Sequence, residues 1–317
     1  MTRTLPLLVT ASLAAFALAG SLSAQDNKVD PIRISIISST DGDFLAYAYG
    51  GVLEEFGYNV KYVRVDYTAQ LAALETGDLD VTTSIWDLTG WDNLVAAVQG
   101  GNVVNHGSTG VKVQEGWWYP DYLTEVCPGL PDWNALKEPA CIEALSTVET
   151  EPYGRFIDAP ADWETDTQGR AEALGLELEA INSGSPVTMV AAMQSAVDKR
   201  EPVLGWGFVP HWFFQSTPGG FVELPAHSDA CYDDPAWGVN PDMTLDCGFA
   251  TGFVWKLGTK AFNDRAPNAA RLLHVFNVST ADVSEATDLV DNQGEDIEAV
   301  AQAWVEAHRA DWSGWLR

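Results

Sequence analysis

The chain has 317 residues, 46% of them apolar, and a formal net charge of -28 at pH 7. This charge argues against nucleic acid and anionic membrane surfaces as partners, because their phosphates would be repelled. The length and apolar content allow a large core and favour two lobes over one.

The N-terminus has the features of a secretory signal. A basic head at residues 1–3 precedes an apolar run at 7–19, and small residues lead to Ala24. The run is shorter than the ~20 residues that span a bilayer. We therefore predict a signal peptide at 1–24, cleaved near Ala24, and a protein free in the periplasm. The first cysteine is Cys127, so we expect no lipid anchor.

Apolar periodicity predicts alternating strands and helices in the first part of the mature chain. The strands are expected at 32–37, 60–65 and 81–85, and the helices at 43–56, 70–77 and 90–98. Gly57 is expected to end the first of these helices. Such an alternation predicts right-handed crossovers and a parallel sheet.

A second alternation begins after Val113. Ser185 and Pro186 open a predicted helix, as capping residue and first-turn proline, and a strand at 203–208 follows it. The C-terminal segment returns to helices. With no flexible linker visible, we expect two lobes joined by strands. The predicted lobe bounds are 28–112 with 216–317 for lobe I, and 113–215 for lobe II.

Four cysteines fit an exported protein with two disulfides. We expect the local pairs Cys127–Cys141 and Cys231–Cys247, because each pair brackets a loop that lacks a core of its own. Crossed pairings remain possible from the sequence alone.

Thirteen tryptophans are many for this length, and several lie where a cleft is expected. Trp86 ends a predicted strand, Trp206 lies within another, and Trp212 follows shortly after it. In open α/β sheets, ligands bind at the carboxyl ends of strands. Trp117 and Trp118 are adjacent in an extended segment, so at most one of them can face a cleft.

A cluster of aromatic faces suits a quaternary or trimethylated ammonium group, which has no hydrogen bond to donate. Each ring contributes ~0.5–2 kcal/mol when desolvated, so three or four rings give roughly 2–8 kcal/mol. Micromolar binding needs about 8 kcal/mol. We therefore expect lobe closure and one polar anchor to supply the rest.

Several motifs together resemble the glycine betaine/choline-type substrate-binding proteins of ABC transporters, over essentially all of the mature length. The matching stretches are GDLDV at 77–81, IW at 85–86, EGWWYP at 115–120, CPGLPDW at 127–133, GRF at 154–156, GWGFVPHW at 205–212 and the AWV of the tail at 303–305. The resemblance implies an α/β, two-lobe periplasmic-binding-protein fold (type II-like) with the ligand cleft between the lobes. It also implies a monomer that requires no cofactor, is not an enzyme, and serves a membrane permease.

The resemblance also implies the cage residues. Trp86 and Trp206 match best, and Trp117, Trp163 and Trp212 come next. Where some members carry a tryptophan near the start of the first helix, this chain has SSTD at 38–41.

The segment 231–247 is predicted to be a disulfide-closed acidic hairpin. Its hard oxygen ligands suit a structural Ca²⁺ ion, although the spacing is not that of an EF-hand; they are Asp233, Asp234, Asn240, Asp242 and Asp246. The alternative is a solvated surface hairpin. An acid-rich metal-binding hairpin beside a cage resembles the trimethylamine N-oxide-binding branch of the family. We therefore expect trimethylamine N-oxide as the solute, with glycine betaine and choline as alternatives.

The solute determines the polar anchor. An N-oxide oxygen accepts hydrogen bonds, and Glu115 could donate one if burial keeps it protonated. Asp41 is the other candidate, and an ionised Asp41 would instead favour a hydroxyl such as that of choline.

Two other classes of function were weighed. An exported hydrolase is disfavoured because the five histidines form no HExxH motif, and neither a GxSxG elbow nor a P-loop is present. Sugar binding would also use tryptophan faces, but sugar sites add many polar donors, and the chain has only 17 lysines and arginines.

Overall fold

The computed structural model describes residues 26–316, so the predicted signal peptide at 1–24 lies outside the described residues. One mixed sheet forms the centre of the molecule. Its strands follow the order β2 (Val60–Arg64), β1 (Ile32–Ile36), β3 (Val81–Trp86), β10 (Thr251–Thr259), β4 (Val103–Pro120), β8 (Gly205–Val209), β6 (Gly154–Pro160) and β7 (Leu178–Ser183), and β9 (Gly219–Phe221) pairs with β4. A short strand, β5 (Pro128–Pro131), lies apart from this order.

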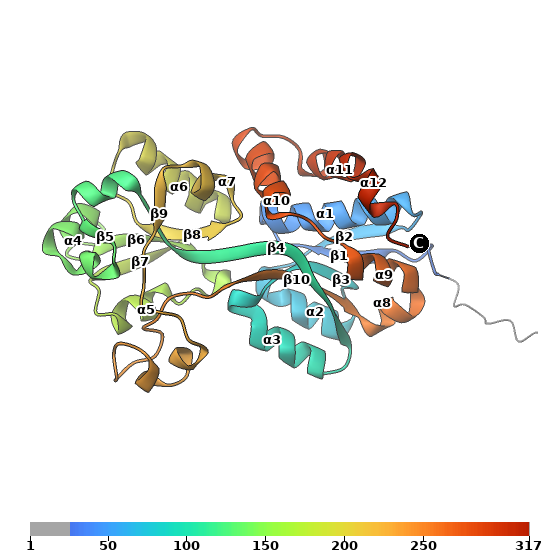
Figure 1. Ribbon diagram of the computed structural model, residues 1–317, viewed down its shortest axis with the longest axis horizontal. Coiled ribbons are helices and arrows are strands. Elements are labelled where there is room, and N and C mark those ends of the chain that lie inside the picture. Colours follow the sequence, from blue (N-terminus) through green and yellow to red (C-terminus); the bar gives the residue numbers. More distant parts are fainter. Residues whose placement is uncertain (1–25, 317) are drawn as a thin grey trace, which may run out of the picture.

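Helices gather at the two ends of this sheet and give the molecule two lobes (Figure 1). Around β1, β2 and β3 lie α1 (Thr40–Glu55), α2 (Gln70–Thr76), α3 (Asp87–Gln99), α8 (Lys260–Arg265), α9 (Pro267–Val275), α10 (Thr280–Thr287), α11 (Ile297–Ala307) and α12 (Arg309–Trp312). At the other end lie α4 (Pro139–Leu145), α5 (Thr167–Ala173), α6 (Pro186–Lys199) and α7 (Trp212–Ser216). The predicted α/β two-lobe fold is confirmed, whereas the predicted lobe bounds remain a prediction.

The direction of the strands follows the path of the chain between the lobes. β1 is parallel to β2 and β3, and β6 is parallel to β7 and β8. The long strand β4 is antiparallel to β8 and β10, and β10 is antiparallel to β3. The chain passes to the second lobe along β4 and returns along β10, so these neighbours run in opposite directions (Figure 1). The prediction of a parallel sheet therefore holds within each lobe and not for the two connecting strands.

Local sequence signals explain how the elements next to the cleft begin. The helix α1 starts at Thr40 rather than at the predicted Asp43, and its first turn carries Asp41 and Asp43. Carboxylates are favoured there by the helix dipole. The helix α6 starts as predicted, with a capping box in which Ser185 and Thr188 exchange hydrogen bonds between side chain and backbone.

Adjacent tryptophans of β4 fill the two sides of the sheet. Trp117 packs on Phe156, with ring centroids 5.2 Å apart, and Trp118 packs on Phe213 at the same distance. Gly207 of β8 makes room for Trp118, because a Cβ atom at this glycine would lie only 2.6 Å from the Trp118 Cβ. Gly205 of the same strand is constrained separately, because a Cβ atom there would lie 2.7 Å from the carbonyl oxygen of Ile157.

Candidate ligand-binding site

A small cavity lies between the lobes, where several strands end. The segment after β1 contributes Ile37, Ser39 and Asp41; the turn 67–69 and the end of β3 contribute Tyr67 and Trp86; β4 contributes Glu115; and the second lobe contributes Trp163, Thr165 and Phe208. The cavity has a volume of about 30 Å³, which is room for no more than a few water molecules. Because the lining residues come from both lobes, a solute bound here would contact both lobes.

Three aromatic rings form one wall of the cavity. The ring of Phe208 lies edge-to-face with Trp86 at 5.9 Å and with Trp163 at 5.4 Å between centroids. The hydroxyl of Tyr67 accepts a hydrogen bond from the backbone N–H of Trp86 at 2.9 Å. Because Trp86 belongs to one lobe and Phe208 and Trp163 to the other, the aromatic wall is complete only when the lobes are close together.

Two buried carboxyl groups form the polar part of the cavity. Burial, together with the negative charges of Asp87 and Asp41, raises the pKa of Glu115 to about 8. Its Oε2 atom has no hydrogen-bond partner among the described residues. Burial also raises the pKa of Asp41, although its side chain accepts a hydrogen bond from the hydroxyl of Ser39. At neutral pH, Glu115 is therefore mainly a neutral hydrogen-bond donor.

Of the residues predicted from the sequence to bind the ligand, four line this cavity: Trp86, Trp163, Glu115 and Asp41. Trp117, Trp206 and Trp212 are not among its lining residues. Their assignment to the ligand site remains a prediction.

The three tryptophans outside the cavity lie close to it. Trp206 faces Trp117 across β8 and β4, and its ring packs on Phe249 at 5.1 Å. It also lines a larger neighbouring cavity of about 670 Å³, which shares Thr165 with the first. Trp212 lines a groove on another side, of about 590 Å³.

Sequence reasoning missed two aromatic residues of the cavity wall. Phe208 lies two positions after Trp206 on the same strand, so strand alternation places both on one face and could have identified it. Tyr67 lies in a short 3₁₀ turn between β2 and α2, where no periodic pattern indicates the direction of a side chain.

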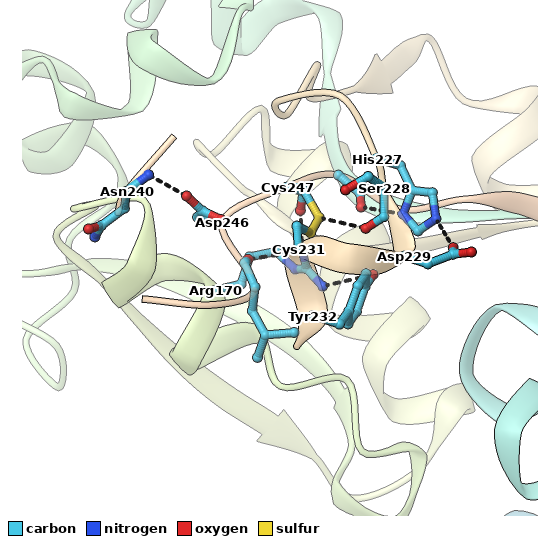
Figure 2. Close-up of a disulfide and its surroundings, with 11 residues drawn as sticks. Arg170, His227, Ser228, Asp229, Cys231, Tyr232, Asn240, Asp246 and Cys247 are labelled. Atoms are coloured by element: carbon cyan, nitrogen blue, oxygen red, sulfur yellow. Dashed lines mark hydrogen bonds and ion pairs between the residues drawn. A yellow bond between two sulfur atoms is a disulfide. The ribbon is translucent and has the colours of Figure 1, made fainter. Parts of the chain in front are cut away.

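Both predicted disulfide pairs are confirmed: Cys127 with Cys141, and Cys231 with Cys247. Figure 2 shows Arg170 of α5 reaching the second pair. Its guanidinium donates to the carbonyl oxygens of Leu245, at 3.1 Å, and of Cys247, and lies 4.2 Å from the centroid of the Phe249 ring. A buried arginine thus fixes the C-terminal end of the hairpin to the second lobe.

The predicted calcium ligands of the hairpin do not converge. Within residues 26–316, no group of three or more His, Cys, Asp or Glu side chains is arranged to hold a metal ion. Asp246 is buried and accepts from the backbone N–H of Asn240 (Figure 2), and Asp234 accepts from Ala236 N at 3.0 Å. Asp242 and Asp233 take part in local backbone turns. The residues in this arrangement do not fit a Ca²⁺ site.

Residues 30–307 match the family model described as the substrate binding domain of ABC-type glycine betaine transport systems. The chain belongs to this family. Its members are solute-binding proteins rather than enzymes, and they need no cofactor. The protein is therefore a substrate-binding protein of ABC-type glycine betaine and osmolyte transport, as the sequence motifs predicted.

Individual relatives agree with the family. The chain is 28% identical over 302 residues to the trimethylamine N-oxide-binding protein of Pelagibacter ubique, with 93% of each chain covered. It is 24% identical to the glycine betaine/proline betaine-binding periplasmic protein of Salmonella typhimurium, covering 98% of this chain and 94% of the relative. The solved structure of a glycine betaine/L-proline-binding protein from Borrelia burgdorferi superimposes with a TM-score of 0.70 at 18% identity, covering 91% of this chain and 97% of that one.

Among residues 26–316, no helix combines the length and the apolar character needed to cross a membrane.

Proposed function

We propose that the protein captures trimethylamine N-oxide in the cavity between its lobes and presents it to a membrane permease. The observation that carries this proposal is the buried carboxyl of Glu115 at an aromatic wall, with its Oε2 atom unpartnered among the described residues. The oxygen of an N-oxide only accepts hydrogen bonds, and a protonated Glu115 is a donor. The relative from Pelagibacter ubique, named for the same solute, supports the choice.

The two ends of the solute find different partners in this arrangement. The methyl groups and the cationic nitrogen face Trp86, Trp163 and Phe208, which together contribute roughly 1.5–6 kcal/mol. The N-oxide oxygen accepts from Glu115, and a hydrogen bond to a charged group adds ~1.5–3 kcal/mol. At its upper end, the sum of these two contributions reaches the roughly 8 kcal/mol that micromolar binding requires.

Glycine betaine and choline are the alternatives. Choline carries a cation and a hydroxyl, so an ionised Asp41 would suit it. Glycine betaine carries a carboxylate, which would face the carboxyl groups of Asp41 and Glu115 without a lysine or arginine among the residues that line the cavity. An ionised Asp41 would repel this carboxylate at a cost of several kcal/mol, which disfavours glycine betaine.

The remaining parts of the proposal concern location and assembly. We propose that residues 1–24 are removed on export and that the mature protein is a periplasmic monomer. We also propose that Trp117, Trp206 and Trp212 complete the aromatic surroundings as the lobes open and close. The Salmonella typhimurium relative is named as periplasmic, which supports the location. The mass of the protein isolated from a periplasmic fraction tests the cleavage.

The experiment that tests the function is calorimetric titration of the mature protein with trimethylamine N-oxide, choline, glycine betaine and carnitine. We expect the N-oxide to bind most tightly. Glu115→Leu should weaken the N-oxide by about 5- to 150-fold, because the oxygen loses its donor in a buried site, and it should weaken choline much less. Tighter binding of choline or glycine betaine would refute the choice of solute and keep the family, whereas no heat from any of the four would refute the methylated-amine proposal.

Repeating the titration in a chelator tests the calcium hypothesis. Because the acids of the hairpin do not converge, we expect the chelator to leave the affinity for the N-oxide unchanged. A loss of affinity that added Ca²⁺ restores would show that these acids do form a metal site.

A further inference from the structure

One side of the cleft is closed by direct contacts between the two lobes. His211, just before α7 of the second lobe, places its Nε2 atom 3.3 Å from Oδ2 of Asp291. Asp291 lies in the first lobe, and its Oδ1 accepts from the hydroxyl of Thr40 at 2.5 Å. Beside this pair, the backbone N–H of Trp212 donates to the hydroxyl of Thr287 at 3.0 Å.

The hydrogen bonds of His211 define which ring nitrogen carries the proton. Its Nδ1 accepts from the backbone N–H of Phe213 at 3.2 Å. A backbone N–H can only donate, so Nδ1 carries no proton in this arrangement, and the N–H of the ring is at Nε2. The Nε2 atom, which carries the N–H of His211, lies 3.3 Å from the carboxylate of Asp291.

This pair lies next to the proposed solute cavity. The ring of His211 packs on Phe208 with centroids 5.0 Å apart. Phe208 and Ser39 line both the cavity and the adjoining groove that contains His211 and Asp291. Neither the cavity nor this groove has a lysine or arginine among its described lining residues, so His211 is their only basic side chain.

Asp291 comes from an uncommon piece of backbone. Residues Asp288–Asn292 form a π-helical turn directly after α10. Such turns are rare and are frequently found at functional sites. This turn directs the Asp291 carboxylate across the lobe boundary, whereas Asp288 of the same turn accepts hydrogen bonds from Asn292 and Gln293 within the first lobe.

We propose that Asp291 determines which methylated amines are accepted, because its carboxylate lies 3.3 Å from Nε2 of His211 and adds a negative charge beside the cavity. A solute with a carboxylate, such as glycine betaine or carnitine, finds a protein carboxylate already next to the imidazole of His211. A solute without a carboxylate, such as trimethylamine N-oxide or choline, is unaffected. This inference rests on the proposed function, since it concerns the selectivity of the same cavity.

The test compares affinities for glycine betaine and trimethylamine N-oxide in three proteins: the wild type, Asp291→Asn and Asp288→Asn. Asp291→Asn should shift the ratio of the two affinities toward glycine betaine by about tenfold or more, because it removes a like charge and frees His211. Asp288→Asn removes the same charge from the same turn but changes no contact of His211. In this variant the ratio of the affinities for glycine betaine and trimethylamine N-oxide should therefore stay at the wild-type value. Combining Asp291→Asn with His211→Gln should reverse part of the gain.

The outcomes separate this inference from the function on which it rests. If the wild type binds the N-oxide and Asp291→Asn weakens both solutes in parallel, Asp291 only holds the lobes together and the selectivity proposal is wrong. An equal shift of the ratio in Asp288→Asn would attribute the effect to net charge and would also overturn it. If neither the wild type nor Asp291→Asn binds any methylated amine, the proposed function itself fails.

Discussion

The protonation of Glu115 makes the affinity for trimethylamine N-oxide dependent on pH. Burial raises the pKa of Glu115 to about 8, so the carboxyl group is mainly protonated at pH 7 and mainly ionised at pH 9. Only the protonated form can donate to the N-oxide oxygen, and the ionised form repels it. Raising the pH across this interval therefore removes the donor from a cavity that otherwise stays the same.

The size of the effect follows from the fraction of protein in the competent form. With a pKa of about 8, that fraction falls from about 0.9 at pH 7 to about 0.1 at pH 9. The apparent affinity is reduced by the same factor, so the Kd for the N-oxide should rise about tenfold, which is ~1.4 kcal/mol. Choline should respond in the opposite direction, because an ionised Glu115 adds a negative charge near its cation.

Calorimetric titration at several values of pH between 6 and 9.5, at constant ionic strength, measures both curves. The matched control is Glu115→Gln, which keeps a donor that does not titrate, so its Kd for the N-oxide should not change with pH over this interval. A flat curve for the wild type, or a tenfold rise that persists in Glu115→Gln, would refute the assignment of Glu115 as the donor. In the second case Asp41, the other buried carboxyl of the cavity, would be the group to examine.

Three further predictions follow from other parts of the structure. Trp163→Ala should lower the affinity for every methylated amine by about 2- to 30-fold through the loss of one ring. The control Trp133→Ala, in a similar turn of the second lobe and outside the cavity lining, should leave these affinities unchanged. Equal losses of affinity in the two variants, measured by titration, would contradict the aromatic wall. Burial lowers the pKa of Lys256 to about 8, below its ordinary 10.5. The stability that this shift contributes is complete above pH 10.5 and is lost as the pH falls to about 8. As the pH rises from about 8 to about 10.5, the free energy of unfolding of the wild type, measured by chemical denaturation, should therefore increase by roughly 3 kcal/mol relative to that of Lys256→Met. Parallel pH dependences of the two proteins would contradict this prediction. Replacing Cys127 and Cys141, 14 positions apart, by alanine should lower the free energy of unfolding in urea by about 3 kcal/mol, and a loss below about 1 kcal/mol would show that this loop adds little.

Much of the fold could be predicted because its signals are local. The alternation of apolar strands and amphipathic helices identified β1, β2 and β3, and the Ser185–Pro186 signal marked the start of α6. The antiparallel course of β4 and β10 could not be predicted in this way. It depends on how the chain passes between the lobes, and the length of β4 carries no periodic signal of that path.

The candidate site was predictable in part for the same reason. Trp86 and Glu115 lie on strands, where alternation and strand ends indicate the direction of side chains. Tyr67 was missed because a 3₁₀ turn carries no such pattern. His211 and Asp291 are 80 positions apart in the sequence, and only the packing of the two lobes brings them together.

The calcium site predicted in the acidic hairpin was wrong for a different reason. Its carboxylates are close in the sequence, which favoured a calcium site, but proximity along the chain does not make side chains converge. In the structure the backbone N–H groups of the loop bind Asp234 and Asp246, and Arg170 takes the carbonyl oxygens of Leu245 and Cys247. One carboxylate oxygen of Asp234 and one of Asp246 are thus used for local structure.

The most direct test of the proposed function is a crystal structure of the mature protein grown with trimethylamine N-oxide. We predict one solute molecule between the lobes, with its methyl groups against Trp86, Trp163 and Phe208 and its oxygen within hydrogen-bonding distance of Glu115. A solute bound instead in the neighbouring cavity beside Trp206, with its oxygen away from Glu115, would contradict the proposed binding site.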